Sequence, residues 1–182
     1  MKRLRKVAIL FLLLLGFMLL NACETPVDPD VEAAQNYEVG DLVTLGSYEF
    51  NVYAIKSGSI YLLATNSIGT ASYSEINQYL NKFSKELDDL GINYTHIGLL
   101  DYETLDNLGG NKHTVSISGQ PYLCDDAPSF VHFEEGYWLS GYSKYDTYTW
   151  LYENEKIYHT QFEDYKHAVR PAVRILATAI PD

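Results

Sequence analysis

The residues that could perform nucleophilic catalysis are few in this chain. A catalytic thiol needs a base within reach, and Cys124 with His132 is the one pair in the sequence that could meet this need. No Gly-x-Ser-x-Gly elbow and no phosphate-cradling glycine loop occurs. We therefore expect Cys124 to be a partly buried, inert thiol and predict no catalytic residue. An enzyme, or an enzyme accessory, with its site around Cys124 and His132 is the alternative.

Metal chemistry has little support in the spacing of possible ligands. No two histidines stand four residues apart, the spacing that places two ligands on one helix face, and Cys124 has no second cysteine nearby. The acidic pairs 125–126 and 134–135 could gather around Ca²⁺, but a solvated acidic loop explains them better. We predict no metal and no cofactor. The histidines considered are His96, His113, His132, His159 and His167.

Recognition is the chemistry that the aromatic residues favour. The chain has 16 Tyr, 7 Phe and 2 Trp, and a row of such rings can stack on a sugar or anchor a partner protein. Such rows also pack against one another as cross-strand pairs, and we expect this packing for Trp138 and Trp150. For the tyrosines, ligand binding and packing both remain open. Arg170 and Arg174 could bind anions, although we expect internal salt bridges in so acidic a chain. The ligand-binding candidates are Tyr137, Trp138, Tyr142, Tyr148, Trp150, Tyr152 and Arg170.

The elements that must position these residues follow from hydrophobic spacing. Apolar residues up to position 90 recur on one helical face, with Ser72 or Ser74 as the cap and Gly91 as the stop. Residues 102–108 form a second, shorter helix. Pro171 predicts that the last strand is bulged there or lies at a sheet edge. These patterns predict the α+β class, with strands at residues 42–45, 48–54, 60–64, 137–140, 147–152, 157–162 and 167–176.

The first 22 residues are typical of an export signal. Four cations precede the apolar run 7–20, which as a helix would reach about 21 Å, short of the ~30 Å core of a bilayer. The residues that follow, Leu20-Asn21-Ala22-Cys23, resemble the lipobox of bacterial lipoproteins, which is cut before a cysteine that carries diacylglycerol. The resemblance implies lipidation of Cys23 and a protein anchored in the cell membrane through that lipid, on the extracytoplasmic face.

Cleavage before Cys23 would divide the chain into three parts. They are a signal peptide over residues 1–22, a lipidated cysteine with a flexible acidic tether over 23–36, and a single domain over 37–182. The part after the signal keeps nine Lys and Arg against 24 Asp and Glu, which argues against nucleic acid and anionic membrane surfaces as partners. Cys124 would have no disulfide partner, so packing must stabilise the domain.

Four short motifs occur in an order that resembles a bacterial domain family of unknown function, frequent in exported proteins. The motifs are Tyr79-Leu80-Asn81, Leu99-Leu100-Asp101-Tyr102-Glu103, Tyr137-Trp138-Leu139-Ser140 and Val169-Arg170-Pro171-Ala172. That family is similar to the C-type-lectin-like superfamily, which includes the formylglycine-generating enzymes. The resemblance implies a C-type-lectin-like mixed domain, with a twisted antiparallel sheet, one long helix and one short helix. The formylglycine-generating relatives use two active-site cysteines, so we do not expect their oxidase chemistry from Cys124 alone.

These patterns predict a membrane-anchored, exported lipoprotein with a non-catalytic recognition domain. The domain would bind a glycan, a cell-wall component or a protein through the strands and loops from Tyr122 to Tyr152. The resemblance also leaves open a hypervariable display protein, with its variation over residues 137–165. A Cys124→Ala substitution separates recognition from catalysis, because it should leave binding intact and abolish an enzyme built on that thiol.

Overall fold

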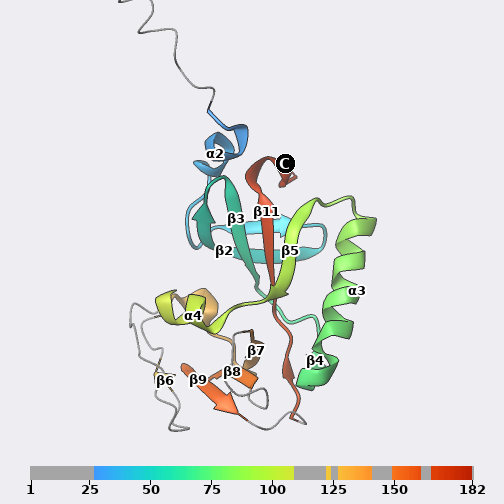
Figure 1. The fold of residues 1–182 in the computed structure, drawn as a ribbon, viewed down its shortest axis with the longest axis vertical. Helices are drawn as coiled ribbons and strands as arrows, with labels where there is room; N and C mark the ends of the chain where they lie inside the picture. Colours follow the sequence, from blue (N-terminus) through green and yellow to red (C-terminus); the bar gives the residue numbers. More distant parts are fainter. Residues whose placement is uncertain (1–26, 109–121, 124–126, 141–148, 161–164, 182) are drawn as a thin grey trace, which may run out of the picture.

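The computed structural model of the chain describes residues 27–108, 122–123, 127–140, 149–160 and 165–181 (Figure 1). Within these ranges the chain forms two β-sheets that lie one above the other along the longest axis, with one long helix beside them. The predicted α+β class is therefore confirmed. The prediction of one antiparallel sheet is wrong, because the described strands divide between two sheets.

The first sheet has five strands in the order β1-β2-β3-β11-β5, and every neighbouring pair is antiparallel. One face carries alternating apolar residues of β2, β3 and β11, which pack with Phe83 and Leu87 of the long helix into one buried cluster. The opposite face carries the residues between them, among them Tyr61 and Arg174. The strands are β1 (Leu42–Leu45), β2 (Tyr48–Lys56), β3 (Ser59–Ala64), β5 (Tyr94–Leu99) and β11 (Pro171–Leu176).

Strand β11 is the last strand of the chain, yet it lies in the middle of the first sheet, between β3 and β5. The prediction that Pro171 marks a bulge or an edge is corrected. Pro171 is the first residue of β11, where a strand tolerates a missing N–H, and the irregularity in the pairing with β5 lies further along, between Arg174 and Ile175.

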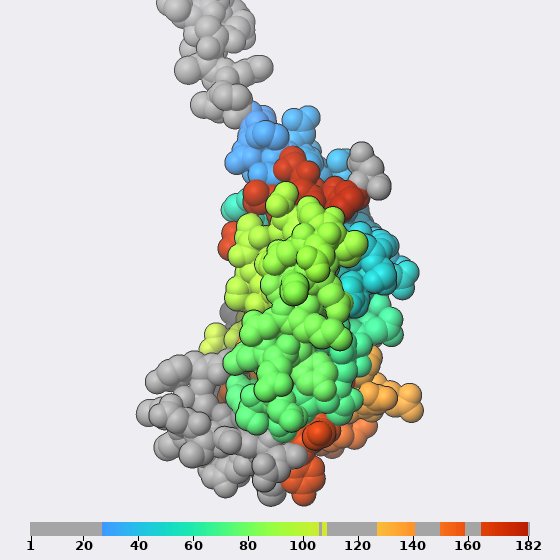
Figure 2. Space-filling view, turned by 90° about the vertical axis from the view of Figure 1, so that its right-hand side faces the viewer, coloured from blue at the N-terminus to red at the C-terminus, as the bar shows by residue number. Residues whose placement is uncertain are grey.

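The long helix α3 (Ile76–Asp89) lies where predicted and ends before Gly91 as predicted, but the predicted cap Ser72 begins a 3₁₀ turn ahead of the helix. The Ser72 backbone N–H and hydroxyl both donate to the Glu75 carboxylate, and a 3₁₀ turn, η1 (Tyr73–Glu75), leads into the helix. At the other end Gly91 takes a positive φ of 72°, which terminates the helix with little strain. Helix α3 runs beside both sheets (Figures 1 and 2), because Phe83 and Leu87 join the cluster of the first sheet while Ile76 joins a cluster of the second.

The second sheet has the order β4-β10-β7-β8-β9-β6, and the β10–β7 pair is parallel. Both faces of its central strands are buried, since Trp138 and Leu151 face one cluster while Tyr137, Leu139 and Trp150 face another. The short helix α4 (Tyr102–Leu108) lies where predicted and adds Leu105 to the second of these clusters. The strands are β4 (Thr70–Ala71), β6 (Tyr122–Leu123), β7 (Tyr137–Leu139), β8 (Thr149–Glu153), β9 (Lys156–Thr160) and β10 (His167–Ala168).

The predicted flexible tether is corrected over its second half. Residues Pro29–Ala34 form helix α2, with Asp28 as its cap and with Ala34 buried. Helix α2 packs against the end of the chain, where the Thr178 backbone N–H and hydroxyl donate to Asp30. Figure 2 shows this contact as blue against red at the upper end of the molecule. The folded domain therefore begins by Pro29 and not near Tyr37.

Substitution of Asp30 by alanine is expected to loosen α2 from the domain at a cost of about 1 kcal/mol, the usual net worth of such hydrogen bonds. Amide hydrogen exchange over residues 29–34 should accelerate, because local opening of the helix becomes easier. Glu32→Ala is the control, since Glu32 is exposed on the same helix. Equal exchange in the two variants would contradict the role given to Asp30.

In the described residues, no helix is both long enough and apolar enough to cross a membrane.

Candidate functional site

The four aromatic candidates in the second sheet lie in its core. Tyr137 and Trp138 have no exposed surface, and Trp150 and Tyr152 have almost none. Tyr137 pairs with Tyr152 across strands β7 and β8, and Tyr102 stacks on Trp150 with ring centroids 4.0 Å apart. Packing, which was expected for Trp138 and Trp150, is therefore confirmed. For Tyr137 and Tyr152, whose role was open, burial favours packing over a ligand platform, because their rings are covered by neighbouring side chains. The remaining candidates Tyr142 and Tyr148, together with Cys23 and Cys124, lie outside the described residues.

The prediction for Arg170 is corrected, because its side chain is only 1% exposed. Its Nε donates to the backbone oxygen of Ala64 at 3.0 Å, and its Nη atoms donate to those of Val131 and Phe130, each at 2.9 Å. The guanidinium carbon lies 4.7 Å from the ring centroid of Tyr137, and burial lowers the pKa of the group. Arg170 thus joins three segments of the core through carbonyl groups, in place of the expected salt bridge or bound anion.

His132 belongs to a shallow hollow of about 330 Å³ at the rim of the second sheet. Its Nδ1 lies 2.6 Å from the Tyr152 hydroxyl oxygen, a pair that could exchange a proton. The described residues contain no group of three or more His, Cys, Asp and Glu that could hold a metal ion. The enzyme alternative, which depends on Cys124, stays a prediction. The hollow is lined by His132, Phe133, Glu134, Tyr152, Asn154 and Glu155.

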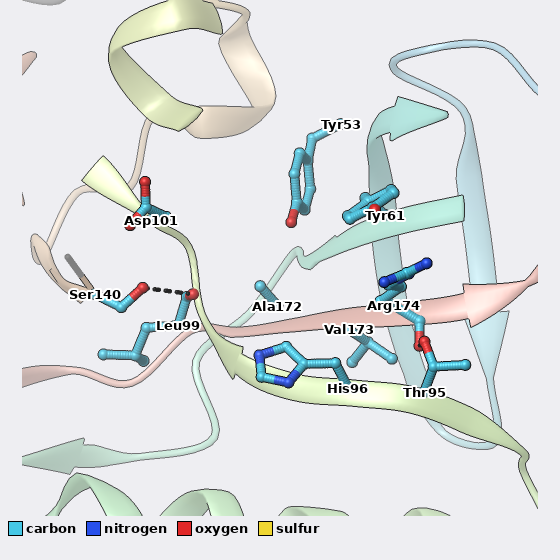
Figure 3. Close-up of a pocket in the computed structure, with 10 residues that line it drawn as sticks. All are labelled: Tyr53, Tyr61, Thr95, His96, Leu99, Asp101, Ser140, Ala172, Val173 and Arg174. Atoms are coloured by element: carbon cyan, nitrogen blue, oxygen red, sulfur yellow. Dashed lines mark hydrogen bonds between the residues drawn. The ribbon is translucent and has the colours of Figure 1, made fainter. Parts of the chain in front are cut away.

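A larger hollow lies on the outer face of the first sheet, at its junction with the second (Figure 3). Its volume is about 410 Å³, within the range of sites that hold small molecules. We call it the Arg174 pocket. Its lining consists of Tyr53, Tyr61, Thr95, His96, Leu99, Asp101, Ser140, Ala172, Val173 and Arg174.

Four neighbouring strands each contribute one side chain to a row along this pocket. Arg174 of β11 lies opposite Tyr61 of β3 on one side and opposite His96 of β5 on the other. Tyr53 lies at an irregularity in the β2–β3 pairing, and its ring centroid is 5.9 Å from that of Tyr61. Sequence reasoning missed Tyr53, Tyr61 and His96 as site residues. Alternation places each on the face of one strand, but only the pairing register brings them together.

Arg174 is held at the centre of this row. Its Nε and Nη2 each lie 3.3 Å from the hydroxyl oxygen of buried Ser59, and its guanidinium carbon lies 5.5 Å from the ring centroid of Tyr61. Among the described residues, no carboxylate forms an ion pair with it. The expected internal salt bridge is therefore corrected for Arg174 as well. The guanidinium is fixed on one side and open on the other.

The hydroxyl of Tyr53 points into the pocket between Asp101 and Arg174 (Figure 3). Burial, reinforced by the nearby Tyr61 and Asp101, raises the pKa of Tyr53 to about 12. At neutral pH the hydroxyl is therefore protonated and can donate a hydrogen bond. No partner for it occurs among the residues that the structure describes.

The segment that connects the two sheets forms the other end of the pocket. Asp101 Oδ1 accepts from the backbone N–H groups of Glu103 and Thr104, at 2.9 and 3.2 Å, and so caps helix α4. The Ser140 hydroxyl donates to the Leu99 backbone oxygen at 3.1 Å. Both sheets must therefore be in place before the pocket is complete.

A second hollow, of about 330 Å³, continues around the edge strand β5 toward the start of α3. It shares His96, Leu99 and Ser140 with the Arg174 pocket. Gly98 makes this continuation possible, because a Cβ there would lie 3.0 Å from Nε2 of His96 and would displace the imidazole. Its other lining residues are Tyr73, Ile76, Asn77, Leu80, Ile97 and Gly98.

The Arg174 pocket combines hydrogen-bond donors with aromatic rings, and the one serine of its described lining, Ser140, donates to a backbone oxygen and not to His96 or Asp101. Such a lining suits the binding of a polar ligand better than bond cleavage. Comparisons of the chain with protein-family models, with curated proteins and with solved structures found no match.

Proposed function

We propose that this chain is an exported, lipid-anchored protein with a non-catalytic domain that binds a glycan or another cell-wall component in the Arg174 pocket. The observation that carries the proposal is the row of Tyr53, Tyr61, Arg174 and His96 across four strands of one sheet face. Sugars are bound in proteins by such combinations of ring faces and hydrogen-bond donors.

The anchor rests on the sequence. The cationic start, the apolar run 7–20 and Cys23 at its end support cleavage and lipidation. Because folded structure begins by Pro29, few residues separate Cys23 from the domain. The pocket would then work close to the membrane surface, at the extracytoplasmic face.

A C-type-lectin-like architecture is part of the proposal. Two sheets with a long flanking helix, and a terminal strand in the middle of one sheet, support a mixed fold of that kind.

Loss of the Tyr61 ring is expected to weaken binding of a captured glycan or wall polymer about five- to thirtyfold, since stacking on an aromatic face contributes about 1–2 kcal/mol. The measurement is an array of glycans and cell-wall polymers probed with the full chain in detergent, followed by titration of the polymers that bind. Tyr61→Phe should retain most of the affinity, because it keeps the ring.

The matched control is Tyr165→Ala, since Tyr165 is exposed and lies outside the pocket lining. Circular dichroism of all three variants verifies that each is folded. Equal loss of binding in Tyr61→Ala and Tyr165→Ala would remove the site from this pocket. Cys124→Ala should bind as the unsubstituted chain does, and loss of binding there would favour a site around Cys124.

A further inference from the structure

Arg174 has no carboxylate partner among the described residues, in a chain that is rich in carboxylates. The chain has 24 Asp and Glu, yet the ion pairs among the described residues are Lys82 with Glu86 and Lys166 with Glu75, both on the surface. Lys56 and Lys85 also have no ion pair among the described residues, so the absence of an acid is not by itself unusual. Arg174 differs in that it lines a pocket, where its charge is available to an anion from outside the chain.

The guanidinium is also oriented for an anion. Nε and Nη2 approach the Ser59 hydroxyl on one edge, which leaves Nη1 and the second Nη2 hydrogen on the opposite edge without a partner among the described residues. Two parallel N–H groups of this kind match the two oxygens of a carboxylate or a phosphate. Because Ser59 and the Tyr61 ring already hold the side chain, little conformational entropy is lost when the anion binds.

The opposite end of the pocket has the reverse polarity. Asp101 uses one carboxylate oxygen to cap α4, and its second oxygen has no hydrogen-bond partner among the described residues. A carboxylate oxygen accepts hydrogen bonds, so this end suits the hydroxyl groups of a ligand. Figure 3 places Asp101 and Arg174 on opposite sides of the pocket, with the Tyr53 hydroxyl between them.

The net charge of the chain limits the kind of anion. The chain has 24 acidic residues against nine basic ones after the signal, so its net charge is negative. It therefore repels a polymer that carries many negative charges, at distances up to the Debye length, about 8 Å in physiological salt. A single anionic group inside the pocket meets Arg174 at contact distance, where the local attraction exceeds the screened repulsion. The ligand should therefore carry an isolated acidic group among neutral ones.

We propose that the Arg174 pocket binds an acidic sugar unit, with its carboxylate or phosphate against Arg174, its ring beside Tyr61 and its hydroxyl groups toward Asp101. This inference rests on the proposed function and specifies its ligand. Carboxylate and phosphate sugars share the required chemistry, and separate probes distinguish them.

The test titrates the full chain in detergent with glucuronic acid, glucose 6-phosphate and glucose, and follows binding by calorimetry and NMR line broadening. One of the two acidic sugars is expected to bind at least about tenfold more tightly than glucose, because charge-assisted hydrogen bonds contribute 1.5–3 kcal/mol. Arg174→Gln should remove that preference, and Arg174→Lys should restore part of it. Lys82→Gln makes the same change of charge at an exposed site on α3 and should leave binding unchanged.

The outcomes separate this inference from the proposed function. Equal affinity for glucose and both acids, with binding still lost in Tyr61→Ala, overturns the acidic specificity and keeps the pocket as a sugar site. A preference for acids that survives Arg174→Gln overturns the role of Arg174. Absence of binding by all three sugars, in a chain that captures a wall polymer through Tyr61, overturns the acidic sugar and leaves the proposed function intact.

Discussion

Replacement of Arg170 by methionine is expected to lower the free energy of unfolding by about 3–5 kcal/mol. The substitution keeps a side chain of similar length but removes the donors to the backbone oxygens of Ala64, Phe130 and Val131. Val131 would still accept from the Tyr137 hydroxyl at 3.1 Å, so the oxygens of Ala64 and Phe130 are the ones that lose a donor. Each buried acceptor without its donor costs about 1–3 kcal/mol.

A counter-argument is that burial of a charge is itself unfavourable, and the lowered pKa of Arg170 reflects that cost. Apolar residues have replaced buried ion pairs in other proteins without loss, but there both partners were removed together. In Arg170→Met the carbonyl groups stay buried while their donor is lost. The free energy of unfolding should therefore fall. Urea unfolding followed by circular dichroism measures the change. Lys82→Met is the control, since that side chain is exposed, and a loss for Arg170→Met as small as that of the control would refute the assignment.

The second large effect is expected at Trp138, where alanine should cost about 3–5 kcal/mol. The indole is fully buried, and its Nε1 donates to the Ala71 backbone oxygen at 2.8 Å. The rings of Tyr73 and His167 meet it edge-on, with centroids 5.5 and 4.9 Å away. Removal of the indole therefore opens a cavity where η1, β4, β7 and β10 meet.

Trp138→Phe separates packing from the hydrogen bond. It keeps an aromatic ring and leaves the Ala71 oxygen without that donor, so we expect a smaller loss, of about 1–3 kcal/mol. Thermal and urea unfolding of both variants gives the comparison, with Tyr165→Ala as an exposed control. If phenylalanine cost as much as alanine, the hydrogen bond and the shape of the indole would matter more than the buried area.

The elements that the sequence predicts correctly have local causes. The span of α3 depends on one apolar face, the Ser72 and Glu75 cap and the positive φ of Gly91, all of which are visible within a few turns of chain. The predicted strands 147–152 and 157–162 correspond to β8 and β9, which the structure joins through Asn154 and Glu155, both with positive φ. Helix α2 has six residues, too few for a periodic pattern, and it depends on Thr178 at the far end of the chain.

The candidate site was missed for a different reason. Alternation along β8 shows that Trp150 and Tyr152 share a face but does not say what covers that face, and in the structure Tyr102 and Tyr137 cover it. The pocket residues Tyr53 and Tyr61 look like ordinary strand positions in the sequence, and Arg174 could be named there only as a possible anion-binding residue. These residues form a pocket only because the strand order brings distant segments of the chain together. A single sequence does not reveal that order.

The central position of β11 has a consequence for how the chain reaches its folded state. Arg174 and Ser59 are in contact although 115 residues separate them. The two pairings that β11 makes, with β3 and with β5, are both long-range, and such pairing slows folding. During synthesis, β3 and β5 have no neighbour between them until residues 171–176 emerge. A chain that cannot complete its core before its last strand is made stays unfolded long enough to be threaded across a membrane, as the proposed export requires. A nonsense mutation before residue 171 would remove β11, an interior strand of the first sheet, and would leave β3 and β5 without their shared neighbour.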